Sequence, residues 1–190
     1  VDATDLIAVA ERFGMIGAVG EWVLDAACRQ IRAWLDAGLR IRVAVNLSAH
    51  QLRQDDLVQR IRRTLERDRV DASLLTFEIT ESVAMEDTGA TLRSFAQLAR
   101  AGASLAIDDF GTGHSSLAYL RTLPAQQLKI DRSFVADLGV NGDAMAVVDA
   151  VIRLAHALGL RVVAEGVETE RQRDILQTLL SQDIVLGARA

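Results

Sequence analysis

Short apolar segments alternate with longer amphipathic stretches along the chain, and this alternation limits the fold more than any other feature. Strands are expected near residues 42–46, 74–78, 104–108, 127–131 and 161–165. Helices are expected near residues 5–13, 21–37, 55–68, 88–101, 143–158 and 168–179. Such an alternation is typical of βα units built on a parallel sheet.

Each expected strand has one bulky apolar face and one small or polar face. Leu128 and Ile130 share one face of their segment, while Lys129 lies on the other, because side chains of a strand alternate in direction. An open sheet covered on both sides favours nearly continuous apolar strands instead. A barrel buries the bulky face against outer helices and carries its active site at the carboxyl ends of the strands. The pattern therefore predicts an α/β fold of the TIM-like (β/α) barrel type.

The number of strands is lower than a complete barrel needs. Such a barrel usually has eight strands in about 250 residues, whereas this chain has 190 residues, five clear strands and a weak sixth near residues 184–186. A smaller open α/β sheet is the alternative. No low-complexity linker or charge run marks a boundary, so residues 1–190 are expected to form one domain.

The charge and the cysteine count restrict the partners and the compartment. A formal net charge of −5 argues against nonspecific binding to duplex nucleic acid, which normally uses a basic face. An acidic protein can still hold phosphates when divalent cations supply the positive charge. A single cysteine, Cys28, indicates a reducing compartment. Without a signal peptide or a long apolar run, we expect a cytoplasmic location, with any membrane anchor outside this chain.

Two adjacent carboxylates, Asp108 and Asp109, begin the sequence Asp-Asp-Phe-Gly-Thr-Gly at residues 108–113. Neighbouring strand residues face opposite sides, so only Asp108 is expected to point inward, and Asp109 lies where the chain turns into the glycine-rich loop. One aspartate can then bridge two cations while the other binds only the second, a common arrangement for phosphoryl displacement. Taken alone, the segment is equally compatible with a turn that caps a helix at Ser115 or Ser116.

Other polar residues also close strands. Asn46 and Glu78 end two of them, although Asn46 alone favours a turn and Glu78 could pair with an arginine. Lys129 faces inward among carboxylates, either as an ion-pair partner or as a positive group for a phosphate and its attacking water. Glu165 ends another strand, and Gly166 after it permits close approach of the backbone.

Together these strand ends predict a metal site. So many clustered carboxylates are unfavourable without protons or cations nearby. Ligand sets made only of oxygen suit magnesium, manganese or calcium rather than zinc. Glu81 is either a group that supports this site or a carboxylate in the first turn of a helix.

Five segments occur in the order and spacing of a known family. They are Asn-Leu-Ser at 46–48, Glu-Ile-Thr-Glu-Ser at 78–82, Asp-Asp-Phe-Gly-Thr-Gly at 108–113, Leu-Lys-Ile-Asp at 128–131 and Ala-Glu-Gly-Val-Glu-Thr at 164–169. Over nearly its whole length the chain resembles EAL-domain cyclic-di-GMP phosphodiesterases. The resemblance implies a hydrolase of bacterial second-messenger signalling. It would depend on Mg²⁺ or Mn²⁺, be inhibited by Ca²⁺, and open cyclic di-GMP to linear pGpG.

The resemblance also implies roles for individual residues. Asn46, Glu78 and Asp108 would bind one metal ion, and Asp108 and Asp109 the other. Lys129 would orient the attacking water or help to deprotonate it.

Further roles follow from the same resemblance. Glu165 would complete the site around the metals and the water, and Asp131 would lie beside the substrate or the second metal. Glu81 would hold the loop of residues 110–116, which in this family contributes to metal binding and dimerisation. The loop residues concerned are Phe110, Gly111, Thr112 and Gly113.

The chain departs from the family pattern at two places. The namesake Glu-Ala-Leu segment and the Gln-Gly-Tyr strand are absent from it. We therefore expect the sequence as given to lack the first two barrel strands and the last one, with segments missing before Val1 and between Leu179 and Leu180.

A rival function and a set of partners complete these expectations. The rival is a catalytically inactive receptor for cyclic di-GMP, or a protein-interaction module of the same fold. Expected partners are cyclic di-GMP, a second copy of the chain, and sensory or GGDEF-type domains outside this chain.

Overall fold

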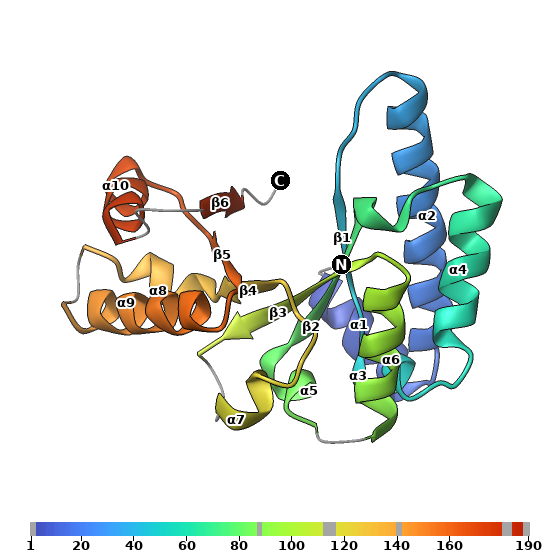
Figure 1. The fold of residues 1–190 in the computed structure, drawn as a ribbon, viewed down its shortest axis with the longest axis horizontal. Helices are drawn as coiled ribbons and strands as arrows, with labels where there is room; N and C mark the ends of the chain where they lie inside the picture. Colours follow the sequence, from blue (N-terminus) through green and yellow to red (C-terminus); the bar gives the residue numbers. More distant parts are fainter. Residues whose placement is uncertain (1–2, 87–88, 112–116, 140–141, 180–183, 188–190) are drawn as a thin grey trace. The chain divides into compact units, whose positions relative to one another are not determined.

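A computed structural model of the chain describes residues 3–86, 89–111, 117–139, 142–179 and 184–187. They form two compact units (Figure 1). Unit 1 comprises Val1–Glu78 and Glu86–Leu105, and unit 2 comprises Ile79–Met85 and Ala106–Ala190. The single domain expected over residues 1–190 stays a prediction.

Unit 1 consists of helices around a pair of parallel strands. Its elements are α1 (Ala3–Arg12), α2 (Ile16–Asp36), β1 (Val43–Asn46), α3 (Ala49–Leu52), α4 (Leu57–Asp68), the 3₁₀ turn η1 (Ala72–Leu74), most of β2 (Leu75–Thr80) and α6 (Gly89–Arg100). α2 and α4 lie side by side (Figure 1). The registers of β1 and β2 place Asn46 opposite Glu78.

The helices of unit 1 bury one apolar face each. In α2, Leu24, Cys28 and Ile31 recur at spacings of four and three residues, which puts them on one face of the helix, and all three are buried. The helix ends before Gly38, whose φ of +78° suits the left-handed position after a helix. The fully or almost fully buried side chains of the unit include Cys28, Ile31, Ile61, Phe77 and Phe95.

Unit 2 carries the remaining elements. They are α5 (Glu81–Ala84), β3 (Ser104–Phe110) except its first residues, α7 (Leu117–Leu120), β4 (Gln127–Ile130), α8 (Arg132–Ala136), α9 (Gly142–Ala157), β5 (Arg161–Glu165), α10 (Glu170–Leu179) and β6 (Ile184–Gly187). From β3 to β6 the strands pair in chain order, and every one of these pairs is parallel. The register shifts between Ile107 and Phe110.

The bulky face of β4 is directed as the sequence pattern predicts. Leu128 and Ile130 are fully buried, and α9 contacts both β4 and β5. α9 buries Val148 and Ile152 on the face that packs in this core. Lys129 is thereby left on the opposite face of β4, beside the polar ends of the neighbouring strands.

The predicted strands and long helices are confirmed, with differences at their ends. The weak sixth strand is present as β6, which pairs with β5. β4 ends at Ile130 rather than Asp131, because Asp131 is the residue that caps α8. The last long helix begins at Glu170, so Glu168 lies before it. Four short helices, α3, α5, α7 and α8, were not expected.

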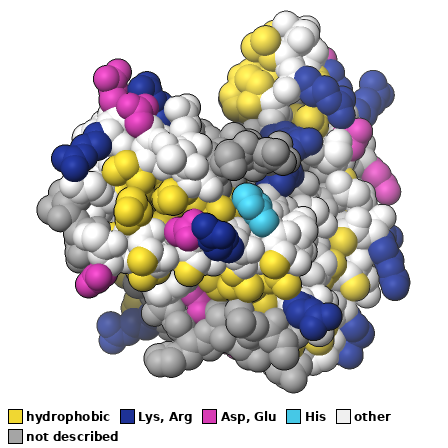
Figure 2. Space-filling model, turned by 60° about the vertical axis from the view of Figure 1, so that its left-hand side comes forward, with side chains coloured by type: hydrophobic (Ala, Val, Ile, Leu, Met, Phe, Trp, Pro, Cys, Tyr) yellow, Lys and Arg dark blue, Asp and Glu magenta, His cyan; other side chains and the backbone are white. Residues whose placement is uncertain are grey.

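Charged side chains of both signs are spread over the surface of the molecule that Figure 2 draws. Lys and Arg side chains lie at several separated places on the face drawn in Figure 2, with Asp and Glu among them. Within the described part of the chain, none of the helices has the length and apolarity needed to cross a membrane.

Candidate metal centre

Three carboxylates of unit 2 converge at the ends of β3 and β5. Asp108, Asp109 and Glu165 each offer an oxygen atom, and these atoms lie within 4.8 Å of one another. Asp108 is 4% exposed and Glu165 is 8% exposed, so two of the three negative charges are shielded from water. Such a group needs a proton or a cation close by.

Lys129 lies between two of these carboxylates. Its Nζ atom is 3.0 Å from Oδ2 of Asp108 and 2.7 Å from Oε1 of Glu165, and the side chain is buried. β4 pairs with both β3 and β5, which explains why a residue of β4 reaches the ends of both neighbours. The ion-pair reading of Lys129 therefore holds, and it places the ammonium group inside the carboxylate cluster.

Asp109 departs from the sequence expectation. Its φ of +54° is left-handed, a conformation that aspartate tolerates better than most residues. The expectation that only Asp108 points into the site is wrong, because the turn at Asp109 brings its carboxylate to the same cluster. The Asp109 N–H donates a hydrogen bond of 3.0 Å to Oδ1 of Asp108.

The environment of Asp109 favours its neutral form. Burial raises the pKa of Asp109, and the negative charges of Asp108, Asp131 and Glu165 raise it further, as does a hydrogen bond with Asp131. A cation in place of the proton would satisfy the same group.

Asp131 has the opposite shift. Burial alone would raise the pKa of Asp131, but hydrogen bonds from Ser133, from the Arg132 N–H and from Asp109 outweigh it and lower the pKa. Its Oδ1 atom accepts from the Ser133 N–H at 3.0 Å and from the Ser133 hydroxyl. Asp131 thus fixes the start of α8, a role that the Asp-x-Ser spacing signals.

Glu81 holds the loop that follows the paired aspartates. It is 2% exposed, and its Oε2 atom accepts a hydrogen bond of 2.8 Å from the Gly111 N–H. It is also the first residue of α5, which Thr80 caps, so the reading as a carboxylate in the first turn of a helix is confirmed. A supporting role at a metal site stays a prediction. Phe110 is buried. Thr112 and Gly113, and the alternative caps Ser115 and Ser116, lie outside the described residues.

Asn46 and Glu78 belong to unit 1. They are opposite each other in the register of β1 and β2, and the Glu78 carbonyl accepts a 2.8 Å hydrogen bond from the Leu47 N–H. Glu78 is buried and Asn46 is exposed. A capping box after β1, in which Ser48 and Gln51 exchange hydrogen bonds, fixes the turn next to Asn46. The metal-binding roles of this pair stay predictions.

The donor set of unit 2 fits a hard divalent cation. All its groups are carboxylate oxygens, which suit magnesium, manganese or calcium. Lys129 supplies one positive charge to these three carboxylates, so a divalent cation would balance the remaining negative charge.

The fold and the cluster together define a parallel α/β domain with carboxylates and a lysine at the ends of its strands. The family model described as the EAL domain matches residues 1–182, and the chain therefore belongs to the EAL domain family.

Relatives and solved structures agree with this assignment. The chain is 49% identical over 172 residues to the bifunctional diguanylate cyclase/cyclic di-GMP phosphodiesterase MucR of Pseudomonas aeruginosa, covering 90% of this chain and 25% of MucR. It is 45% identical to the cyclic di-GMP phosphodiesterase NbdA of the same organism, covering 90% of this chain and 22% of NbdA. The chain thus spans about a quarter of the length of these relatives.

A solved structure, the PaMucR phosphodiesterase in complex with c-di-GMP, superimposes with a TM-score of 0.91. It is 46% identical, and the match covers 97% of this chain and 75% of that chain. The predicted fold class, an α/β fold of the TIM-like barrel type, is confirmed by this likeness and by the family match.

Proposed function

We propose that this domain is a divalent-metal-dependent phosphodiesterase that hydrolyses cyclic di-GMP to linear pGpG. The observation that carries the proposal is the position of Lys129, whose Nζ atom lies within 3.0 Å of both Asp108 and Glu165. A positive group inside a carboxylate cluster suits a reaction in which water attacks a phosphate held by cations. The names of MucR and NbdA support the same substrate.

The metal ligands follow the family pattern. Asn46, Glu78 and Asp108 would hold one ion, and Asp108 and Asp109 a second, with Mg²⁺ or Mn²⁺ as the ion. Such cations neutralise the phosphate oxygens and acidify a bound water. The left-handed turn at Asp109 supports this assignment, because it brings both neighbouring carboxylates to one place.

The product defines which bond must break. One phosphodiester of the ring is opened, and pGpG keeps the phosphate on a 5′ oxygen. The oxygen of water therefore bonds to phosphorus, the bond from phosphorus to a ribose 3′ oxygen breaks, and that oxygen gains a proton.

Residues of this chain would orient the water, contact the substrate and hold the neighbouring loop. Lys129 orients the attacking water and offers N–H groups to the phosphate, while Glu165 fixes the ammonium at 2.7 Å. Asp131 lies beside Asp109 and would face the substrate or the second ion. Glu81 keeps the loop at Gly111 in place.

Product analysis tests this function. The purified protein is incubated with cyclic di-GMP and Mg²⁺, then with Mn²⁺ and with Ca²⁺, and the nucleotides are separated by chromatography. We expect pGpG with Mg²⁺ or Mn²⁺ and little with Ca²⁺. Asp108→Asn, prepared in parallel, reports contaminating activity. Binding of cyclic di-GMP without pGpG would instead favour an inactive receptor of the same fold.

Further partners are also proposed. MucR is named a bifunctional protein and is about four times as long as its match to this chain, which supports a link to sensory or GGDEF-type domains. We also propose a homodimer, which light scattering of the purified protein would detect as twice the monomer mass.

A further inference from the structure

Two glycines lie one or two residues after carboxylates of the cluster. Gly111 comes after Asp108, Asp109 and Phe110, and Gly166 comes after Glu165. Both have left-handed backbones, with φ of +102° at Gly111 and +70° at Gly166. Glycine adopts this region without steric cost, whereas residues with a Cβ atom adopt it only at a cost.

Neither glycine has room for a side chain. A Cβ atom at Gly166 would lie 2.8 Å from Cβ and 3.5 Å from Cα of Arg132. A Cβ atom at Gly111 would lie 2.9 Å from Cε2 and 3.2 Å from Cζ of Phe134. The backbone at Gly166 is therefore in close contact with Arg132, and the backbone at Gly111 is in close contact with the ring of Phe134.

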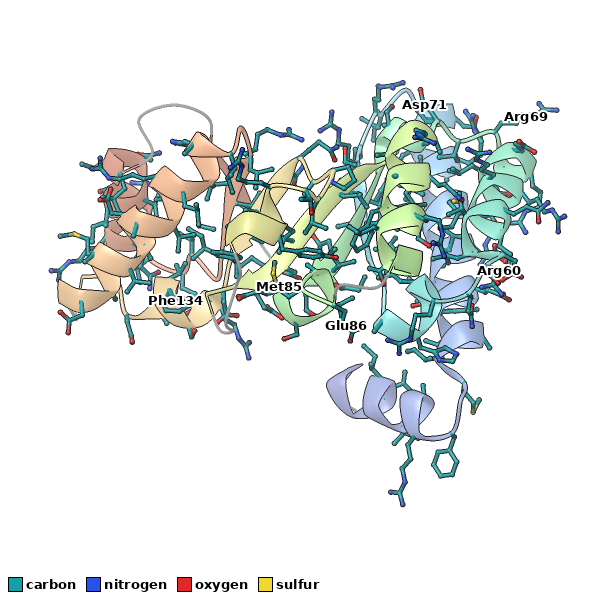
Figure 3. The ribbon with its side chains drawn as sticks, turned by 60° about the horizontal axis from the view of Figure 1, so that its bottom comes forward. Arg60, Arg69, Asp71, Met85, Glu86 and Phe134 are labelled. Atoms are coloured by element: carbon teal, nitrogen blue, oxygen red, sulfur yellow. The ribbon has the colours of Figure 1, made fainter. Side chains whose placement is uncertain are left out.

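Both of these neighbours belong to the same short helix. Arg132 and Phe134 lie in α8, and Figure 3 labels Phe134. The helix starts immediately after Asp131 and only three residues beyond Lys129. Val135 of the same helix is fully buried, and α8 contacts α9 and β5. The helix is thus anchored in the core of unit 2 and touches the loops after β3 and β5.

We propose that α8 is a rigid support that sets the spacing of the carboxylates around Lys129. Arg132 and Phe134 are then positioning residues. The loop after β5 contacts Arg132 at Gly166, and the loop after β3 contacts Phe134 at Gly111. Groups that orient metal ligands typically change metal affinity by 10–100-fold when altered. The inference rests on the proposed metal-dependent function.

Gly166 and Gly159 form a matched pair for the test. Gly159 has a φ of +72°, and nothing lies within 4 Å of a Cβ atom placed on it. Gly159→Ala therefore adds backbone strain alone, whereas Gly166→Ala adds similar strain and the contact with Arg132. Because Gly166 adjoins Glu165 and Gly159 does not, a variant that relieves the contact with α8 is needed as well.

The readout is the Mn²⁺ dissociation constant of the purified protein without nucleotide, measured by calorimetry or electron paramagnetic resonance. Both variants should lower the melting temperature, but only Gly166→Ala should weaken Mn²⁺ binding, by about tenfold or more. Adding Arg132→Gly to Gly166→Ala removes the nearest atom and should restore most of the affinity, relative to Arg132→Gly alone. Equal Mn²⁺ affinities in Gly159→Ala and Gly166→Ala would overturn the proposal, as would a failure of the double variant to recover.

A second pair covers the case in which Gly166→Ala does not fold. Phe134→Ala removes the ring under Gly111, and Leu176→Ala removes buried apolar volume from α10, outside the proposed support. We expect weaker Mn²⁺ binding only in Phe134→Ala, although both lower the melting temperature. An effect of the same size in both variants would reduce α8 to a general stabilising element. If the parent protein binds Mn²⁺ without hydrolysing cyclic di-GMP, only the proposed function fails.

Discussion

The ammonium group of Lys129 lies 2.7 Å from a carboxylate oxygen of Glu165 and 3.0 Å from one of Asp108. Removing a buried ion-pair partner leaves the other charges uncompensated. We expect Lys129→Met to lower kcat by about 100-fold or more while cyclic di-GMP binding changes little. Steady-state kinetics and equilibrium dialysis would measure the two effects. Equal losses of turnover and binding would mean that Lys129 is only structural.

We expect the stability of the same variant to depend on divalent metal ions more than that of the parent protein does. Without divalent ions, Lys129→Met should have an unfolding free energy about 3 kcal/mol lower than that of the parent protein. Mn²⁺ should raise the unfolding free energy of the variant more than it raises that of the parent. Urea unfolding with EDTA and with Mn²⁺ measures this. Arg53→Met is the control, because the Arg53–Glu86 pair is exposed and should contribute less than about 1 kcal/mol.

Asp108 is the ligand that the proposed function shares between two ions. Asp108→Asn keeps the size of the side chain but removes its charge, so we expect hydrolysis to fall by about 1,000-fold or more. Asp137→Asn is a suitable control, since Asp137 is an exposed residue at the end of α8 and should keep normal activity. Activity of Asp108→Asn near that of the parent would exclude the shared ligand.

The hydrogen bond from Gly111 to Glu81 can be tested with two substitutions. Glu81→Gln keeps an oxygen that can accept from the Gly111 N–H, whereas Glu81→Ala removes the acceptor and costs about 1 kcal/mol. We expect Glu81→Ala to lower Mn²⁺ affinity and turnover by about tenfold, and Glu81→Gln to retain most of both. If the two variants behave alike, the charge of Glu81 matters rather than its hold on the loop.

Much of the fold was predictable because strand patterns are local. Leu128 and Ile130 alternate with Lys129 in the sequence, and the structure buries the first two in the core and directs the third to the cluster. The convergence of Asp108 and Glu165 was predictable as well, because parallel strands carry their polar ends to one edge.

Other features depend on contacts between distant segments or on single backbone angles. The left-handed φ of Asp109 has no periodicity to reveal it, and no pattern in the sequence links Gly166 with Arg132. The four short helices are too short for an amphipathic repeat. α3 did have a signal, the capping box formed by Ser48 and Gln51, and Asp131 signals α8 in a similar way.

Cys28 gives a prediction about pH. Its side chain is fully buried, and burial, followed by the charges of Asp68 and Asp25, raises the pKa of its thiol from 9.0 to about 11. A folded pKa above the unfolded value favours the neutral thiol in the folded state. The resulting stability is present below pH 9 and is lost as the pH rises towards 11. The difference in unfolding free energy is of the order of 2–3 kcal/mol.

Comparison with Cys28→Ala isolates this effect from other groups that titrate in the alkaline range. The variant loses some packing at every pH, but it has no thiol to ionise in the unfolded state. Urea unfolding at pH 8, 9, 10 and 11 should therefore show the stability advantage of the parent protein shrinking as the pH rises. Parallel stability curves for the two proteins would mean that the thiol ionises as readily in the folded state as in the unfolded one, and that the interior around α2 admits water to Cys28.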